Sequence, residues 1–170
     1  KRIGILGASV TQHPQFKDLL EALQSDKYGD VRVSLSSVRA NTVTEELART
    51  LVSRGSKSVT IAVESGSERL REIINKKLKN DEIIEAGLRG QAGGLSSMKL
   101  YGMAGIPGEV SSDHAETMEM FRALQREIRS SASKRPGSGN GMRLTFGCST
   151  FVPKAHTPFQ WFGVRKDAEK

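Results

Sequence analysis

Residues 58–66 read SVTIAVESG, a β-branched apolar run that ends in a carboxylate, a serine and a glycine. The run Ser58–Val63 predicts a buried strand, because β-branched residues pack well on a pleated surface. A carboxylate directly after a buried strand needs a partner or a ligand. Glu64 is therefore the first candidate functional residue. Ser65 and Gly66 have a simpler alternative explanation, since a serine and a glycine also suit the turn and cap that open a helix.

Strands and helices alternate along the rest of the chain. Further strands are predicted at 2–8, 31–38 and 98–104, with a last one beginning at 143–146. Helices are predicted over 14–25, from Thr44 to Gly55, from Ser67 through Ile74, from about Asp81 to 93–94, and over 111–129. This order predicts right-handed βαβ units and one parallel sheet with both faces covered, so that each strand, including 2–8, is expected to be buried.

Composition narrows the class of protein. The chain has 170 residues, a single cysteine, and no apolar run long enough to span a membrane. We therefore expect no disulfide within the chain, no membrane partner, and a reducing compartment, cytoplasmic or organellar. The net charge of +7 suggests nucleic acid as a partner, but the aromatic content of 5% argues against a stacking platform for single strands. Part of the charge lies in or beside 130–141, a Ser, Gly and basic segment predicted to be a flexible insertion.

Polar or glycine residues follow every predicted strand. They are Ala8-Ser9, Ser36-Ser37-Val38-Arg39, Glu64-Ser65-Gly66, the loop Gly105–Glu109, and the segment Phe151–Pro158. Ligands of parallel α/β folds bind at the carboxyl ends of the strands, so these groups are predicted to converge on one rim. Two milder explanations stay open: Arg39 on a solvated rim, and Pro107-Gly108 as an ordinary turn.

Two other kinds of site are disfavoured. His13, His114 and His156 lie far apart and lack metal-ligand spacing. A dinucleotide fingerprint would need glycines at fixed spacing after Gly7, and that pattern fails.

The strand ends, taken together, resemble the radical S-adenosylmethionine (SAM) superfamily, and in particular its methylthiotransferase-like and cobalamin-linked branch. The matching segments are ILGAS at 5–9, SSVRAN at 36–41, ESGSERL at 64–70, IINK at 73–76, GIPGE at 105–109, FVPK at 151–154 and HTPFQW at 156–161. The resemblance covers nearly the whole chain, as a domain over 1–163 with a tail at 164–170. ESGSERL and GIPGE, in this order and spacing, are its most specific parts.

The resemblance implies a partial TIM-like (β/α) barrel, with about five of six βα units present. It implies an enzyme that uses SAM and a 4Fe–4S cluster, cleaves SAM reductively to a 5′-deoxyadenosyl radical, and modifies an unknown substrate, RNA or protein, with an electron donor as partner. Its SAM-binding residues would be Glu64 and Ser65 on the ribose or amino-acid part, Arg39 on the SAM carboxylate, the loop with Gly105, Gly108 and Glu109 against the adenine, and Lys154 and His156 at the mouth. Ser37 would also belong to the SAM site.

One departure from the family is plain. Its cluster is held by Cys-x-x-x-Cys-x-x-Cys, whereas this sequence has one cysteine, Cys148, elsewhere. Either the motif lies upstream, in a missing N-terminal part of the same protein, or the chain is a degenerate relative of the family. The start of the sequence at a strand favours the first explanation, so we expect an N-terminally truncated chain that is inactive and poorly stable alone. The alternatives are a non-catalytic nucleoside- or RNA-binding module, resting on the net charge and the basic loop, and a nicotinamide oxidoreductase.

Overall fold

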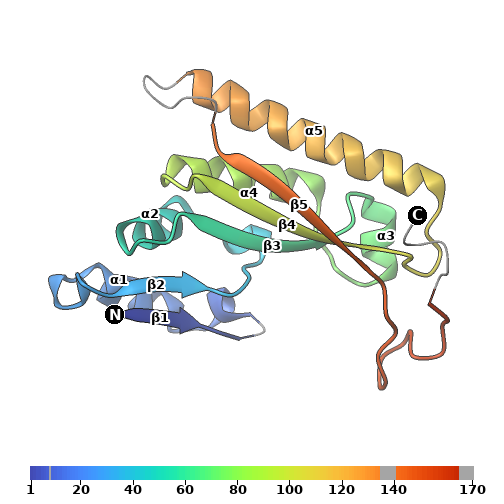
Figure 1. Cartoon of the computed structure of the whole chain (residues 1–170), viewed down its shortest axis with the longest axis horizontal. Helices are drawn as coiled ribbons and strands as arrows, with labels where there is room; N and C mark the ends of the chain where they lie inside the picture. Colours follow the sequence, from blue (N-terminus) through green and yellow to red (C-terminus); the bar gives the residue numbers. More distant parts are fainter. Residues whose placement is uncertain (8, 135–140, 165–170) are drawn as a thin grey trace.

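The computed structural model describes residues 1–7, 9–134 and 141–164. Within these residues the five predicted strands are all present (Figure 1). They are β1 (Arg2–Ile5), β2 (Arg32–Leu35), β3 (Ser58–Glu64), β4 (Ser97–Ala104) and β5 (Arg143–Thr150). Every pairing between neighbouring strands is parallel, which confirms the predicted parallel α/β class.

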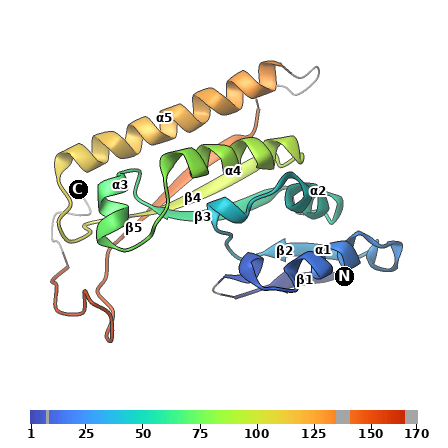
Figure 2. The same cartoon turned by 180° about the vertical axis from the view of Figure 1, so that it is seen from behind.

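The helices cover one side of the strands. They are α1 (Phe16–Gln24), α2 (Glu45–Ser53), α3 (Glu68–Ile73), α4 (Asn80–Ala92) and α5 (Ser111–Ser133), with short 3-10 turns η1 (Val10–Gln12), η2 (Asp26–Tyr28) and η3 (Ala40–Thr42). Figures 1 and 2 show the helices behind the strands from one side and in front of them from the other. The opposite face of the strands carries no helix within the described part of the chain, as on the inner side of an open (β/α) barrel.

The predicted continuous sheet is divided in two. β1 pairs with β2, and β3, β4 and β5 pair in that order. Among the described residues these sheets are joined by an isolated parallel bridge between Val38 and Ile61, where the amide of Val38 donates to the Thr60 carbonyl at 2.9 Å. The regular pairing of β2 ends at Leu35, so the sheet opens before this bridge.

The core lies between the three-stranded sheet and the helices. Alternate residues of β3 and β4 face it, and Ile61, Val63, Met98 and Leu100 are almost completely buried. The prediction of a buried strand over 2–8 was wrong, because the strand ends at Ile5 and has an exposed pattern, with Ile3 49% exposed. Its only strand partner in the described chain is β2, so little covers its outer edge.

Helix boundaries follow the expected end signals. The Thr44 hydroxyl accepts a hydrogen bond from the amide of Leu47 at 3.0 Å, and Gly55 adopts a φ of 78° just beyond α2. Helix α5 runs to Ser133 and so takes up the first residues of the predicted insertion 130–141. Residues 135–140 of that insertion, and the tail from 165, lie outside the described residues. No described helix has the length and apolarity that crossing a membrane requires.

Candidate functional site

Glu64 lies at a sharp turn at the end of β3. Its φ is +66°, and the amide of Ser65 donates to the carbonyl of Val63 at 2.9 Å. A hydrogen bond over two residues with a positive φ between them is the rarer and more strained kind of γ-turn. The register of β3 against β4 shifts at the same place, between Ala62 and Glu64. The chain thus accepts local strain to place this carboxylate, which is typical of functional positions.

Lys76 meets Glu64 from the turn between α3 and α4. Its Nζ lies 3.0 Å from Oε1 of Glu64, and both side chains are partly buried, at 30% and 21% exposure. The residues on either side, Asn75 and Lys77, have φ values of 55° and 47°. Two residues in the left-handed region around Lys76 therefore hold it in a tight turn that faces the strand end.

A pocket of about 530 Å³, here called the central pocket, opens beside this ion pair. It is lined by Glu64, Ile73, Ile74, Asn75, Lys76, Met103, Phe151, Val152, Lys154, Thr157, Pro158 and Phe159. Most of this wall is apolar, and the polar groups are few. A largely apolar wall with a few convergent charges is the usual composition of a small-molecule site.

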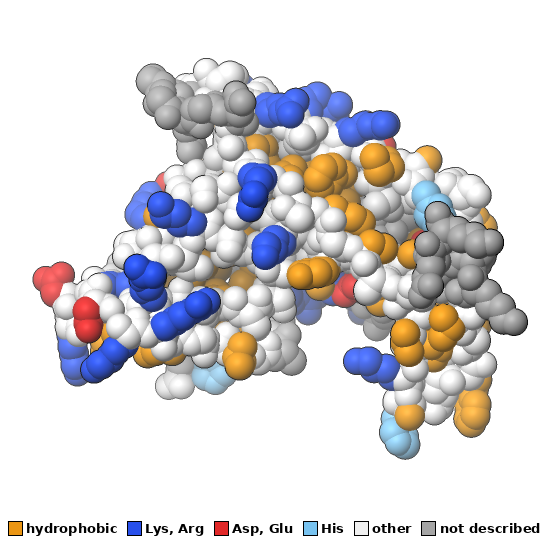
Figure 3. All heavy atoms as spheres, in the orientation of Figure 1, with side chains coloured by type: hydrophobic (Ala, Val, Ile, Leu, Met, Phe, Trp, Pro, Cys, Tyr) orange, Lys and Arg blue, Asp and Glu red, His pale blue; other side chains and the backbone are white. Residues whose placement is uncertain are grey.

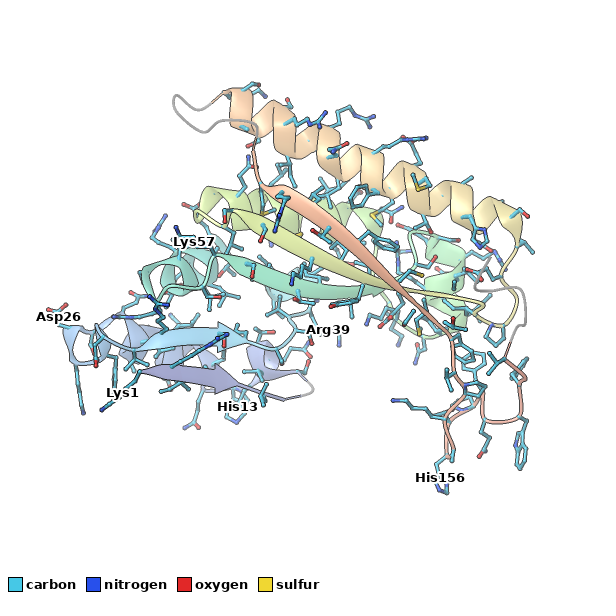
Figure 4. The ribbon with its side chains drawn as sticks, in the orientation of Figure 1. Lys1, His13, Asp26, Arg39, Lys57 and His156 are labelled. Carbon is cyan, nitrogen blue, oxygen red and sulfur yellow. The ribbon has the colours of Figure 1, made fainter. Side chains whose placement is uncertain are left out.

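A second pocket of about 160 Å³, here called the rim pocket, lies at the end of β2. It is lined by Ser9, Ser37, Val38, Arg39, Ala40, Asn41, Ala62, Lys76, Lys77 and Leu78. Figure 4 shows Arg39 at the end of β2, between the two sheets. Lys76 lines both pockets, so the Glu64–Lys76 pair stands where they meet.

Arg71, which was not among the predicted site residues, holds together the two segments of chain that carry Glu64 and Lys76. Its side chain is fully buried in α3. Nη1 donates to the carbonyl of Ser65 at 2.5 Å, Nε to that of Leu78 at 2.7 Å, and Nη2 to Oδ1 of Asn80 at 2.7 Å. One guanidinium thereby ties the chain after Glu64 to the end of the turn that carries Lys76.

The segment after Glu64 is held against α5. The Gly66 amide donates to Oγ1 of Thr117 at 3.0 Å, and a Cβ on Gly66 would lie 2.3 Å from the Cα of Thr117. Only glycine permits this approach. Ser65 is buried, and its Oγ accepts from the amide of Ser67 at 3.1 Å and lies 3.3 Å from the Thr117 hydroxyl. The hydrogen bonding of Ser65 thus resembles the turn-and-cap alternative, and its contact with a ligand stays a prediction.

The loop Gly105–Glu109 is closed by its own carboxylate. Oε2 of Glu109 accepts from the amide of Gly105 at 2.5 Å, and Oε1 lies 3.4 Å from Nε2 of His114. Gly105 and Gly108 have φ values of 81° and 85°. The loop lines neither pocket; instead Ile106 packs with Phe151, a wall residue of the central pocket. Direct contact of Gly105, Gly108 or Glu109 with a ligand stays a prediction.

Asp113, at the start of α5, links this loop to α3. Its buried carboxylate accepts from Oγ of Ser67 at 2.7 Å, from Arg69 at 2.5 Å and from the amide of Val110 at 2.8 Å. Burial raises the pKa of Asp113, but the hydrogen bonds from Arg69, Ser67 and Val110 outweigh it and hold the pKa below the ordinary range. Arg69 also donates to the carbonyl of Gly108 at 2.9 Å.

The predicted site residues therefore divide into groups. Glu64 and Lys154 share the central pocket, and Ser37 and Arg39 share the rim pocket. His156 is exposed at the tip of the C-terminal segment and points away from the body of the molecule (Figure 4). It lines neither pocket, and its predicted place beside Lys154 at the mouth of the site stays a prediction.

Three residues form or support the site without a clear signal in the sequence, namely Lys76, Arg71 and Asp113. Lys76 was inside a matching segment, IINK, although its pairing with Glu64 could not be foreseen. Among the described residues no three His, Cys, Asp or Glu side chains are placed to hold a metal ion. Cys148 lies exposed on β5.

Comparison with known proteins bears on the family and the fold of this chain. A family model described as "Radical SAM superfamily" matches residues 1–121. The uncharacterized protein MJ0966 of Methanocaldococcus jannaschii is 32% identical over 159 residues, which are 94% of this chain and 32% of that protein. A solved structure of coproporphyrinogen III oxidase (HemN) from Escherichia coli, described as a radical SAM enzyme, has a TM-score of 0.58 at 14% identity, over 94% of this chain and 33% of that one.

The likeness to the coproporphyrinogen III oxidase structure concerns the fold alone, and it agrees with a partial TIM-like barrel. The chain spans about a third of the length of both proteins. The family match covers well over half of the chain, including β1 to β4 and the Glu64 turn. The chain belongs to the radical SAM superfamily.

Proposed function

We propose that this chain is the SAM-binding part of a radical SAM enzyme, with SAM held across the central and rim pockets. The observation that carries the proposal is the Glu64–Lys76 pair, set by a strained turn at the junction of the two pockets. Proteins of this superfamily use SAM and a 4Fe–4S cluster. The ESGSERL and GIPGE segments support the methylthiotransferase-like and cobalamin-linked branch as the narrower proposal.

The residues present fit SAM in chemical character. SAM combines a flat purine, ribose hydroxyls, an ammonium group and a carboxylate. The apolar wall with Ile73 and Phe151 suits the purine, and Glu64 can accept hydrogen bonds from hydroxyl or ammonium groups. Ser37 and Arg39 in the rim pocket suit the carboxylate, since a guanidinium offers a planar fork of donors.

The residues present do not fit a 4Fe–4S cluster. Such clusters are held by cysteine thiolates, and this sequence contains Cys148 alone. We therefore limit the role of this chain to binding and orienting SAM. The cluster ligands, the electron donor and the substrate are proposed to belong to the longer protein or its partners, and reductive cleavage of SAM is proposed for that whole protein only.

The test is SAM binding by the chain itself, measured by isothermal titration calorimetry. We expect saturable binding, and at least about a tenfold loss of affinity for Glu64→Gln, because a neutral amide removes the charge that holds an ammonium or a pair of hydroxyls. Glu119→Gln is the matched control, because Glu119 is exposed on α5. The absence of saturable binding, or equal affinity of Glu64→Gln and the unaltered chain, would overturn the proposal.

The lone cysteine also favours a second candidate function, that of a non-catalytic module that binds nucleosides. It predicts that adenosine binds as tightly as SAM. The proposed SAM site predicts instead that adenosine binds at least about tenfold more weakly, because it lacks the charged amino-acid part that Arg39 and Glu64 would hold. The same titration with adenosine separates the two functions.

A further inference from the structure

We propose that the open face of the two sheets binds single-stranded RNA through its phosphates. The face is defined by Arg2, Arg32, Lys99 and Arg143 and is here called the basic sheet face. The inference goes beyond the proposed function, because it uses none of the residues assigned to SAM.

The two cations on the smaller sheet lie side by side. Arg2 and Arg32 are register partners across β1 and β2, so their backbones are only about 4.8 Å apart. Both are exposed, while Val33 of β2 is buried on the opposite side, toward the helices. Like charges directly opposite one another cost stability. An anion bound beside these two side chains would remove that cost.

The larger sheet continues the pattern. Lys99 and Tyr101 are exposed, and they alternate with the buried Met98 and Leu100, so they point away from the helices. In register, Lys99 lies between Thr60 on β3 and Thr145 on β5. This cross-strand row presents an ammonium flanked by hydroxyl groups, which are all donors that contact phosphate oxygens.

Arg143 adds a second cation beside Lys99. It pairs with Ser97, two residues before Lys99 on the neighbouring strand, so it is the diagonal neighbour of Lys99 at roughly 7–8 Å. The ring of Tyr101 lies over Gly147, where an added Cβ would be 3.0 Å from the nearest ring carbon. Because Tyr101 is the single aromatic side chain of these rows, we expect phosphate contact, not base stacking, to dominate.

These cations have no acidic partners in the part of the chain that the structure describes. None of the four forms an ion pair within the described residues, whereas the acidic residues that do pair lie mainly on the helices, as in Arg49–Glu45 and Arg89–Glu85. Figure 3 shows Lys and Arg side chains over the strands and along α5, with few acidic side chains on this face.

Charge and shape favour RNA over other anionic partners. Protein interfaces have an apolar centre that is depleted of charge, whereas the rows that carry these cations otherwise bear Ser and Thr side chains. Membrane-binding surfaces pair basic residues with protruding apolar ones. Separated, unpaired cations among hydroxyl groups are instead typical of a surface that follows a phosphodiester backbone.

The test uses the whole chain and a fluorescein-labelled 15-nucleotide poly(U), with fluorescence anisotropy measured from 50 to 300 mM NaCl. We expect binding that weakens with salt. For Lys99→Gln/Arg143→Gln, the slope of log affinity against log salt should fall by about 1.4, because each phosphate contact of a single strand contributes about 0.7. Affinity at 50 mM NaCl should fall at least about tenfold.

Lys17→Gln/Lys27→Gln is the matched control, because it removes the same charge from exposed sites on α1 and η2. It should change affinity less than about twofold. Arg2→Gln/Arg32→Gln is a second test on the other sheet and should weaken binding as the first variant does. Both face variants should bind SAM like the unaltered chain, which shows that they are folded and separates this inference from the proposed function.

Three results would overturn the inference. They are no binding of poly(U) at 50 mM NaCl, an equal loss in the control variant, and displacement of poly(U) by polyglutamate or by anionic phosphatidylserine vesicles at the same charge concentration. The last result would show a generic anionic or membrane surface.

Discussion

The two sheets of this chain are built from strands of the same direction, but they are covered to very different degrees. In the three-stranded sheet, the residues of β3 and β4 that face the helices are almost completely buried, among them Ile61 and Leu100. In the two-stranded sheet, β1 has no fully buried residue, and Ile3 and the following Leu6 are 49% and 79% exposed. The three-stranded sheet, here called the enclosed sheet, therefore offers a rigid support. The two-stranded sheet, here called the open sheet, does not.

The difference shows which region holds the site. The strained Glu64 turn lies on the enclosed sheet, where Arg71 and Asp113 fix the backbone around it. The open sheet contributes Ser37 and Arg39, which follow β2 and have fewer constraints. A strained conformation persists only where surrounding contacts over-determine it, so the Glu64 turn needs the enclosed sheet.

The largest effect is expected from Arg71→Ala. It would leave two carbonyls and the Asn80 side chain without their donor and open a cavity, so we expect a loss of about 3–5 kcal/mol in the free energy of unfolding. Urea denaturation measures the loss. SAM binding should also weaken at conditions where the variant remains folded, because the Glu64 and Lys76 segments are no longer tied together.

Arg54→Ala is its matched control near the open sheet. Arg54 is also buried and donates to three carbonyls, those of Leu23, Ser25 and Tyr28. Its loss should cost comparable stability, while the folded variant keeps its affinity for SAM. Equal losses of SAM affinity in both variants would contradict the special role of Arg71.

A pair of apolar truncations compares the two sheets directly. Leu100→Ala on β4 should lower the free energy of unfolding by about 2–5 kcal/mol, because a fully buried side chain is replaced by a cavity. Ile3→Ala on β1 should cost less than about 1 kcal/mol, since half of that side chain already faces solvent. Comparable losses would show that β1 is enclosed in solution.

The lowered pKa of Asp113 predicts that the free energy of unfolding falls in acid. Its pKa is held below the ordinary value of about 3.9, so the folded state favours the charged carboxylate. The stability from this group is fully present above pH 3.9 and is lost as the pH falls through the lower pKa of the folded state. Asp113→Asn should cost about 1–3 kcal/mol at pH 7. Urea denaturation from pH 7 to pH 3 should show a flatter pH dependence for the variant; an unchanged profile would contradict this role.

The smallest effect is expected at the start of α2, the helix beside both sheets. Thr44→Ala removes the hydroxyl that accepts from the Leu47 amide and should cost about 1 kcal/mol. Thr44→Ser should restore most of it, because the cap oxygen returns. Thermal unfolding of the two variants measures the difference, and equal midpoints would rule out a capping role.

Local signals predicted much of this fold. The run Ser58–Val63 gave a strand within one residue of β3, and Thr44 and Gly55 marked the ends of α2. These predictions succeeded because side-chain period and capping act over a few residues. The exposure of β1 could not be predicted in this way, since an apolar run shows only that a strand can be buried and not whether another element covers it.

Part of the site was also predicted from local signals. The sequence by itself determined a parallel order of strands and therefore that Arg39, Glu64 and Lys154 follow strand ends. Only the tertiary structure decided that Arg39 and Lys154 enter different pockets, that Lys76 joins them through Glu64, and that His156 points outward. The physical reason is range: backbone direction follows from local patterns, whereas the partner of a charge depends on turns and helices brought together from distant parts of the chain.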